Sequence, residues 1–481
     1  MPHVIRPVHI FAAAIMLVTL ACGKKEQAVV VPSVVLDTTS YVEPAAVGTF
    51  PSRKEVIEGW IAAGDTVKIR QHGWDIWAAL TAPTPKGLPV WETFYSGHEI
   101  FELDSTDKAD SPGLRHVRDY EVPAQHVHVR RAAIMSHGIP VDVDERRTSF
   151  NRFSQATAQY ITQHRLNFTE TLDSINNAFN AANTPIAQRQ VFVTQDSVDY
   201  RSFVLKVVFQ FISGDSVSAV PTWRSYGAGR SSNDTLPVAD TWMQGVAVDP
   251  TGKLPLGMSI VMPVNGGTPQ ALKVVHLKSF YWIKLTQADV DHFSTFVRPQ
   301  GDDLGAANHA DSASLMQMVK PGNIALLMAM HVTGKEIPNW TWQTFYWSPG
   351  RDSLNYDRPA TITAPWNNYS MNTAYMMVNP DGQPRVAFNP YLETNLNGHF
   401  PAATSPKWFG VQTNCMTCHR LASRGLIDTT LTFAPYGPAQ NIDPGNPSLF
   451  TGITKLDFLW SVAFRARPAG QVPVKVRHRQ P

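Results

Sequence analysis

Sulfur, charge and long apolar runs are all scarce in this 481-residue sequence. Its three cysteines are too few for a fold held together by a disulfide framework. Charged residues make up 17% of the chain and the formal net charge is +2, which argues against nucleic-acid or polyacid partners. After the first 21 residues, no stretch reaches the about 18–20 apolar residues that a bilayer span needs.

The N-terminus is typical of an export signal. An apolar run over residues 10–20 follows a weakly basic start and is too short to span a bilayer. It ends in "VTLAC", which resembles the lipobox of bacterial lipoproteins, where the cysteine is acylated and begins the mature chain. The resemblance implies a signal peptide over 1–21 and a lipid on Cys22 as the only membrane attachment. An ordinary signal peptide, with no role for Cys22, is the alternative.

Localisation follows from the same residues. Gly23, rather than an aspartate, follows the lipobox cysteine, and the resemblance to sorted lipoproteins then favours an outer-membrane anchor. The mature protein is therefore expected in the periplasm or at the cell surface. Residues 22–50 have no helical period and several prolines, and they are interpreted as a tether.

The remaining two cysteines stand close together in "NCMTCH", as Cys415 and Cys418 directly before His419. The pattern C-x-x-C-H is the attachment signature of c-type haem, in which each thiol bonds one vinyl group and the histidine binds iron. Residues three and four apart share one face of a helix, so the three side chains can address one porphyrin. The motif predicts a single covalent haem c with His419 as the proximal iron ligand.

Three competing interpretations of the motif are weaker. A thioredoxin-like redox pair would need a βαβ context, which the surrounding sequence does not show. A zinc site normally has four ligands, and no second pair of cysteines is present. A plain disulfide between Cys415 and Cys418 would leave His419 without a role.

Residues 405–465 resemble the c-type cytochromes, and the whole chain is similar to a group of exported bacterial monohaem cytochrome c lipoproteins. The shared stretches are "GWDIWAALT", "PVWETFY", "AMHVTGKEIPNWTWQTFYW", "FNPYLET" and "NCMTCH". The resemblance implies haem binding and electron transfer and indicates no substrate. It also implies that a backbone carbonyl near Pro435 accepts the second N–H of His419, because metal-bound histidines usually have such a partner.

The second axial ligand of the iron is not evident from the sequence, because no methionine follows Met416. Met371 and His399 are the leading upstream candidates, although methionine often only fills core space and His399 could be a loop residue. A weaker donor could also bind the iron, or the iron could keep one open face.

His331 could face the haem or a substrate, or it could be a hydrogen-bonded histidine at a strand end. The identity of the second axial ligand sets the redox potential of the haem and the access of small molecules to its iron.

Residues 51–400 predict an α+β fold rich in strands, as a sandwich or a mixed sheet. A capping box of Ser52 and Glu55 predicts a short helix ending near Gly64, and residues 147–183 are expected to form one or two helices. Runs of β-branched and aromatic residues predict strands at 202–212, 272–285, 324–334 and 339–347.

A small, mostly helical, cytochrome c-like haem segment over 401–470 is expected to follow, before a basic tail over 471–481. Thr454 and Asp457 resemble a capping box for a last helix whose apolar residues recur at helical spacing. Electron transfer is the favoured function, with a redox partner protein or a quinone-linked chain. The alternatives are a haem enzyme or a gas or peroxide sensor with an open iron face, and a ligand-binding β module with a relay haem.

Overall fold

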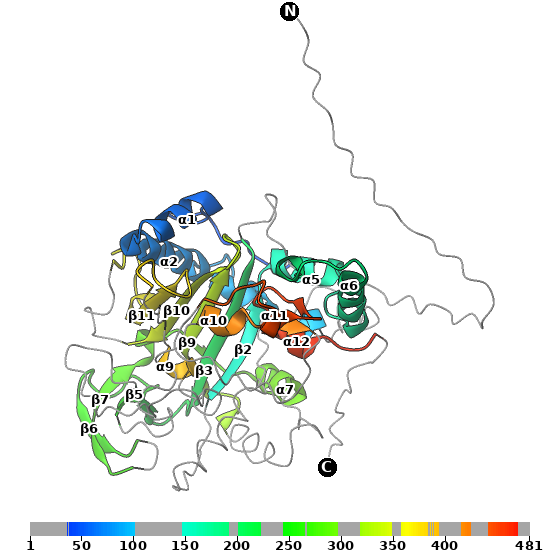
Figure 1. Ribbon diagram of the computed structural model, residues 1–481. Coiled ribbons are helices and arrows are strands. Elements are labelled where there is room, and N and C mark those ends of the chain that lie inside the picture. The colour runs from blue at the N-terminus through cyan, green and yellow to red at the C-terminus, as the bar shows by residue number, and fades with distance from the viewer. Residues whose placement is uncertain are drawn as a thin grey trace, which may run out of the picture.

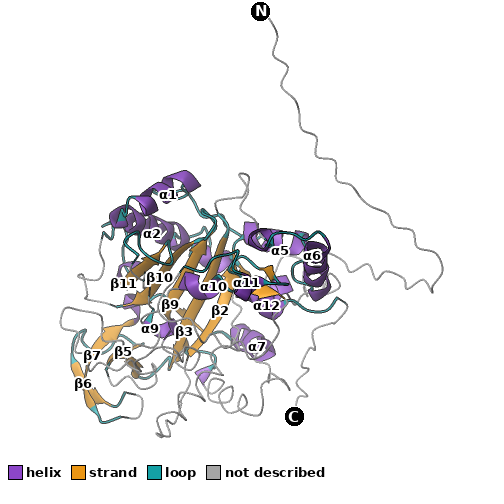
Figure 2. Cartoon of the chain, in the orientation of Figure 1, coloured by secondary structure: helices purple, strands orange, loops and turns teal. Residues whose placement is uncertain are grey.

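The described residues of the computed structural model form two larger sheets with mostly antiparallel pairing, one two-stranded sheet and several helices (Figures 1 and 2). The predicted α+β class is therefore confirmed. The structure describes the following residues: 36, 38–101, 147–191, 201–222, 244–264, 267–296, 318–348, 357–382, 385, 387, 389–393, 415–424 and 441–469.

The larger sheet has seven strands in the order β1-β2-β3-β9-β10-β11, with β8 pairing beside one end of β9. All neighbours in it are antiparallel. The long runs of β-branched and aromatic residues form its centre, as predicted, because both faces of these strands are covered. The strands are β1 Tyr95–Ser96, β2 Arg147–Phe153, β3 Phe203–Ile212, β8 Trp282–Lys284, β9 Ile324–Gly334, β10 Thr341–Trp347 and β11 Tyr369–Ala374.

A smaller four-stranded sheet has the order β4-β5-β7-β6. Its β5–β7 pair is parallel, whereas the other two pairs are antiparallel. The run predicted as a strand at 272–285 is divided between the two sheets, because β7 ends and a 3-10 turn separates it from β8. The strands are β4 Ser218–Pro221, β5 Gly245–Asp249, β6 Ser259–Met262 and β7 Gln270–His276.

Helices α1 (Lys54–Ala62) and α2 (Thr66–Thr81) cover one face of the larger sheet (Figure 1). The indole of Trp77 stacks on the ring of Phe345 of β10 at a centroid distance of 4.0 Å. The predicted short helix is confirmed as α1, but its capping box is wrong. Arg53 is the N-cap, and the backbone N–H of Ser52 instead donates to a carboxylate oxygen of Glu336 at 2.8 Å.

The opposite face of the larger sheet carries helices from the second half of the chain, α9 to α12, with α5 and α6 beside them (Figure 1). The helical prediction for 147–183 is half right: residues 154–183 hold α5 and α6, but residues 147–153 are strand β2, which pairs with β3. The remaining helices are α3 Gly97–Phe101, α5 Gln155–Gln163, α6 Thr169–Ala181, α7 Gln287–Phe296, α9 Pro390–Glu393, α10 Cys415–His419, α11 Pro447–Phe450 and α12 Trp460–Arg465, with 3-10 turns η1 Val90–Thr93, η2 Ile186–Gln188, η4 Leu277–Ser279 and η6 Trp366–Asn368.

The last helix is shorter than the sequence predicts. Thr454 and Lys455 form strand β13, which pairs with β12 (Ser423–Arg424), and α12 begins only at Trp460. The capping box of Thr454 and Asp457 is therefore wrong, because the Asp457 side chain is buried in an ion pair instead of capping a helix. Phe464 of the predicted apolar stripe is 56% exposed.

Two large hydrophobic clusters pack around the larger sheet. One cluster joins α2 to the sheet, and the other joins α10 and α12 to α3, α5 and the ends of β2 and β10. Trp340, Trp342 and Met416 belong to the second cluster, so residues far apart in the sequence share one interior. The CMTCH motif therefore packs against the sheet through Met416.

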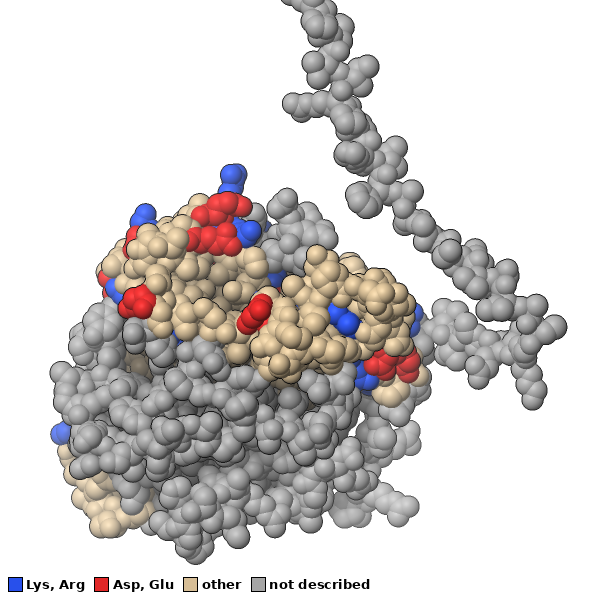
Figure 3. All heavy atoms as spheres, viewed as in Figure 1, with Lys and Arg blue, Asp and Glu red and all other residues tan. Residues whose placement is uncertain are grey.

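The surface agrees with the low charge content of the sequence. On the face shown in Figure 3, acidic and basic side chains of the described residues are interspersed among uncharged ones. Within the described ranges, no helix has both the length and the apolar character needed to cross a membrane.

Removing the ring of Phe345 should destabilise the fold. Phe345→Ala takes a fully buried ring away from the Trp77 stack, and such truncations cost about 3–5 kcal/mol of unfolding free energy. Phe464→Ala makes the same deletion at an exposed position and should cost less than about 1 kcal/mol. Chemical denaturation followed by circular dichroism measures both, and equal losses would show that the Trp77–Phe345 stack is not a centre of the core.

Candidate functional site

The CMTCH residues form one short helix, α10 (Cys415–His419). Positions 418 and 419 are three and four residues after position 415, so each lies on the same side of the helix as position 415. Met416 is fully buried in the cluster beneath, and Cys415 is partly buried.

His419 has one ring nitrogen fixed by the protein. Its Nδ1 lies 2.7 Å from the backbone carbonyl oxygen of Phe458. A carbonyl can only accept, so Nδ1 carries the proton when the ring is neutral, and Nε2 holds the lone pair. The rings of Trp342 and His419 pack edge to face at a centroid distance of 4.6 Å. The imidazole is thus held in one tautomer and one orientation.

The electrostatic surroundings keep this imidazole neutral. Desolvation lowers the pKa of His419 to about 3, against the opposing hydrogen bond to Phe458, and the charges of Lys206 and His331 lower it further. A neutral imidazole is the form that binds metal. The ring is therefore ready to act as a ligand at any pH well above 3.

The carbonyl that holds His419 belongs to an unusual turn. Asp457 and Phe458 both have left-handed backbone conformations, with φ of 49° and 69°. Non-glycine residues rarely adopt this region, and the surrounding structure must hold them there, most often at functional sites. The acceptor expected near Pro435, which lies outside the described residues, is supplied by Phe458 instead. The turn brings a residue 39 positions away from His419 into contact with it.

A buried ion pair holds that turn. The Asp457 carboxylate lies 2.5 Å from the Lys335 ammonium, and both side chains are fully buried. Trp340 Nε1 and Gln190 Nε2 donate to the same carboxylate at 3.1 and 3.0 Å. Burial raises the pKa of Asp457 and lowers that of Lys335, and the attraction between them opposes both shifts. Trp340 is itself left-handed, with φ of 60°.

Arg420 ties α10 to the same region. Its Nη1 donates to Asn339 Oδ1 at 3.1 Å, and its guanidinium lies 5.3 Å from the centre of the Phe458 ring. Asn339 and Lys335 both belong to the turn between β9 and β10. The β9–β10 turn therefore contacts both sides of the site, the helix through Arg420 and the Phe458 turn through Asp457.

The sheet face beneath α10 carries a row of polar side chains. Lys206 of β3 pairs with His331 of β9, His331 pairs with Thr344 of β10, and Thr344 pairs with Asn372 of β11. Directly paired residues share a face, and Thr344 is two positions from Trp342, so the row lies on the face that His419 contacts. Of the four, all but Thr344 are partly exposed, whereas most of the central sheet is buried.

Met371, one candidate for the second axial ligand, lies on the other face. It pairs with Phe345, and its sulfur occupies the space beside Gly73 of α2. The structure therefore does not bring Met371 to His419, and the residue fills core space. His399 and Cys22 lie outside the described residues, as do the signal peptide and the basic tail.

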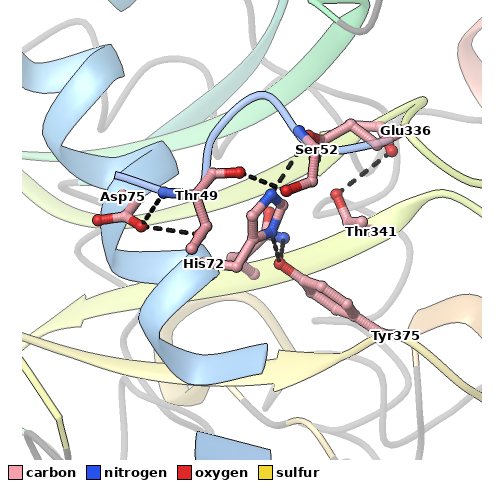
Figure 4. Close-up of polar contacts among 9 residues, drawn as sticks. Thr49, Ser52, His72, Asp75, Glu336, Thr341 and Tyr375 are labelled. Atoms are coloured by element: carbon pink, nitrogen blue, oxygen red, sulfur yellow. Dashed lines mark hydrogen bonds and ion pairs between the residues drawn. The ribbon is translucent and has the colours of Figure 1, made fainter. Parts of the chain in front are cut away.

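A second polar cluster lies against α2, on the Met371 face of the sheet (Figure 4). His72 Nδ1 lies 2.6 Å from the Tyr375 hydroxyl, and His72 Nε2 lies 3.2 Å from Glu336 Oε1. Gln343 Nε2 donates to the same hydroxyl at 2.7 Å. All four side chains are buried. Burial, with a contribution from the charge of Glu336, raises the pKa of Tyr375 well above its usual range, so the phenol stays protonated.

The two clusters adjoin through neighbouring residues. Lys335 and Trp342 belong to the His419 site, whereas Glu336 and Gln343, which directly follow them in the sequence, belong to the His72 cluster. Sequence reasoning identified the CMTCH residues but missed the roles of Lys335, Asp457 and Phe458. The combination "TGKEIPNW" was the available signal, since two adjacent charges in a largely apolar stretch need partners when buried.

Comparisons of the chain with models of protein families, with curated proteins and with solved structures found no match.

Breaking the buried ion pair should destabilise the protein strongly. Asp457→Asn leaves the Lys335 ammonium buried without its counter-charge, and such changes cost about 3–5 kcal/mol of unfolding free energy. The double variant Lys335→Met with Asp457→Asn should recover part of this loss, because no buried charge remains. Chemical denaturation measures the three unfolding free energies.

The matched control is Asp173→Asn. Asp173 pairs with Arg424 at 3.0 Å in the same part of the molecule, but its side chain is 55% exposed. Exposed pairs contribute about 0–1 kcal/mol. If Asp457→Asn cost no more than this control, Lys335–Asp457 would not be a structural support.

Proposed function

We propose that the protein is an exported, lipid-anchored monohaem c-type cytochrome that acts in electron transfer. The observation that supports this most is the state of His419. Its Nδ1 donates to a carbonyl oxygen, its Nε2 holds a lone pair, and it belongs to a helical C-x-x-C-H turn. A metal-bound histidine almost always has its second nitrogen held in this way.

The residues present suit a covalently bound haem. Cys415 and Cys418 supply the two thiols for thioether bonds, and His419 supplies a neutral imidazole for the iron. When bound, the haem iron would supply one-electron exchange between its ferric and ferrous forms. We assign residues 401–470 to a cytochrome c-like haem-binding region. Its described parts pack on the sheet of the larger region 51–400.

The chain itself holds the proximal ligand rigidly. The Phe458 carbonyl fixes the ring through Nδ1, and the indole of Trp342 packs against it. The Asp457 ion pair holds the turn that carries this carbonyl. A ligand held this firmly keeps the same geometry in both oxidation states of the iron. Small structural change on electron exchange is what a carrier needs.

Electron transfer requires a partner, for which we propose a redox protein or a quinone-linked chain in the periplasm or at the outer membrane. The basic tail over 471–481 is suited to docking with an acidic partner surface.

A haem enzyme or a gas or peroxide sensor is the second candidate function. The partly exposed row of Lys206, His331 and Asn372 beside His419 favours it, because polar residues there could meet a small ligand. A ligand-binding β module with a relay haem is the third.

Covalent haem attachment is the direct test. The mature chain, made in a host that matures c-type cytochromes, should gain the mass of one haem and keep its colour after denaturation. Cys415→Ser and Cys418→Ser should each lose one thioether, and the double variant should lose covalent haem entirely. Mass spectrometry measures this, and a colourless wild-type protein without added mass would contradict the proposal.

The third cysteine provides a matched control and a test of the anchor. Cys22→Ser, exported by a cleavable signal without a lipobox, should keep its haem and lose its lipid. Labelling with a radioactive fatty acid and fractionation of membranes measure the lipid. Label on the Cys22→Ser variant, or none on the wild type, would rule out the proposed anchor while leaving the haem assignment standing.

A further inference from the structure

Two histidines approach the same region of the sheet from different parts of the chain. His419 of α10 packs its ring against Trp342 of β10. Trp342 pairs with Thr333 of β9, and His331 lies two residues before Thr333 on that strand. Diagonal neighbours of this kind lie about 7–8 Å apart and on the same face. His331 is therefore a diagonal neighbour of the residue that His419 contacts.

Both histidines have the same ring nitrogen engaged. His331 Nδ1 lies 2.7 Å from Thr344 Oγ1, and His419 Nδ1 lies 2.7 Å from the Phe458 carbonyl oxygen. Thr344 Oγ1 also accepts from Asn389 Nδ2 at 2.7 Å, which fixes the hydroxyl oxygen. A hydroxyl oxygen has two lone pairs, so it can accept from both. Metal binding by either imidazole would then use Nε2.

The second histidine is supported as ligating histidines usually are. Such residues have a hydrogen bond that orients the ring and sets its tautomer, and this partner is in turn held by others. Thr344 and Asn389 form that arrangement for His331, while Phe458 and Asp457 form it for His419. His331 is also partly exposed, unlike the buried residues before and after it on β9.

We propose that His331 would bind the haem iron as the second protein ligand, together with His419. The inference rests on the proposed function, and it replaces Met371, which lies across the sheet. With two imidazole ligands the iron has no open face, and an electron carrier is favoured over the enzyme and the sensor. Two imidazoles also set a lower potential than a histidine and methionine pair, because methionine ligation raises it.

The test is spectroscopic and uses the mature, haem-loaded protein. Ferric wild type should show the low-spin electron paramagnetic resonance signal of bis-imidazole haem, and the ferrous protein should not bind carbon monoxide. His331→Ala should become wholly high-spin and bind carbon monoxide when reduced. Added imidazole should restore the low-spin signal to this variant, because it replaces the lost side chain.

A second variant at His331 and a control variant at another histidine test whether the spectral change is specific to iron ligation. His331→Met should give a methionine-to-iron charge-transfer band and a higher potential than the wild type. His276→Ala removes another partly buried strand histidine, whose Nε2 bonds the Leu254 carbonyl at 2.8 Å, and should leave the spectrum unchanged. Covalent haem per chain, measured by mass, should be the same in all variants.

Each outcome has one meaning. Covalent haem with a high-spin wild type, or a His331→Ala spectrum equal to that of the wild type, overturns the ligand assignment and leaves the cytochrome proposal intact. A methionine charge-transfer band in the wild type also overturns it and points to an upstream methionine. Absence of covalent haem from the wild type overturns the proposed function, and the ligand assignment with it.

Discussion

The buried contact between Lys335 and Asp457 is the constraint on which the rest of the site depends. Moving two charges out of water costs several kcal/mol for each ion, and only close approach and further hydrogen bonds offset that cost. Here Trp340 and Gln190 supply those bonds. The pair joins the β9–β10 turn to the turn that carries Phe458, and so sets the carbonyl against which His419 is oriented.

The larger sheet divides the molecule into two chemically distinct faces. One face is covered by α1 and α2 and holds the buried network of His72, Glu336 and Tyr375. The other face receives α10 and carries the polar row that includes His331. Alternation along β10 separates the two, since neighbouring side chains on a strand point to opposite faces. The sheet therefore separates the His419 site from the His72 network.

Local patterns predicted elements well where the pattern and the burial agree. The apolar runs of β3, β9 and β10 are strands because both of their faces are covered, and the sequence of α1 is a helix as its composition suggests. The two capping-box predictions were wrong because each proposed capping residue bonds a partner that is distant in the sequence. Ser52 does not cap α1, because its hydroxyl donates to the Thr49 carbonyl and its backbone N–H donates to Glu336. Asp457 does not cap α12, because its carboxylate bonds Lys335. Capping rules describe local competition and do not include such partners.

The sequence by itself determined the residue types and the spacing of the CMTCH turn. The types and spacing of Cys415, Cys418 and His419 follow from helical geometry within five residues, and the turn is helical in the structure. Only the tertiary structure decided what surrounds it. Phe458 lies 39 residues from His419, and His331 lies 88 residues from it. Strand register and the left-handed turn bring them together, and contacts over such separations leave no periodic signal in the sequence.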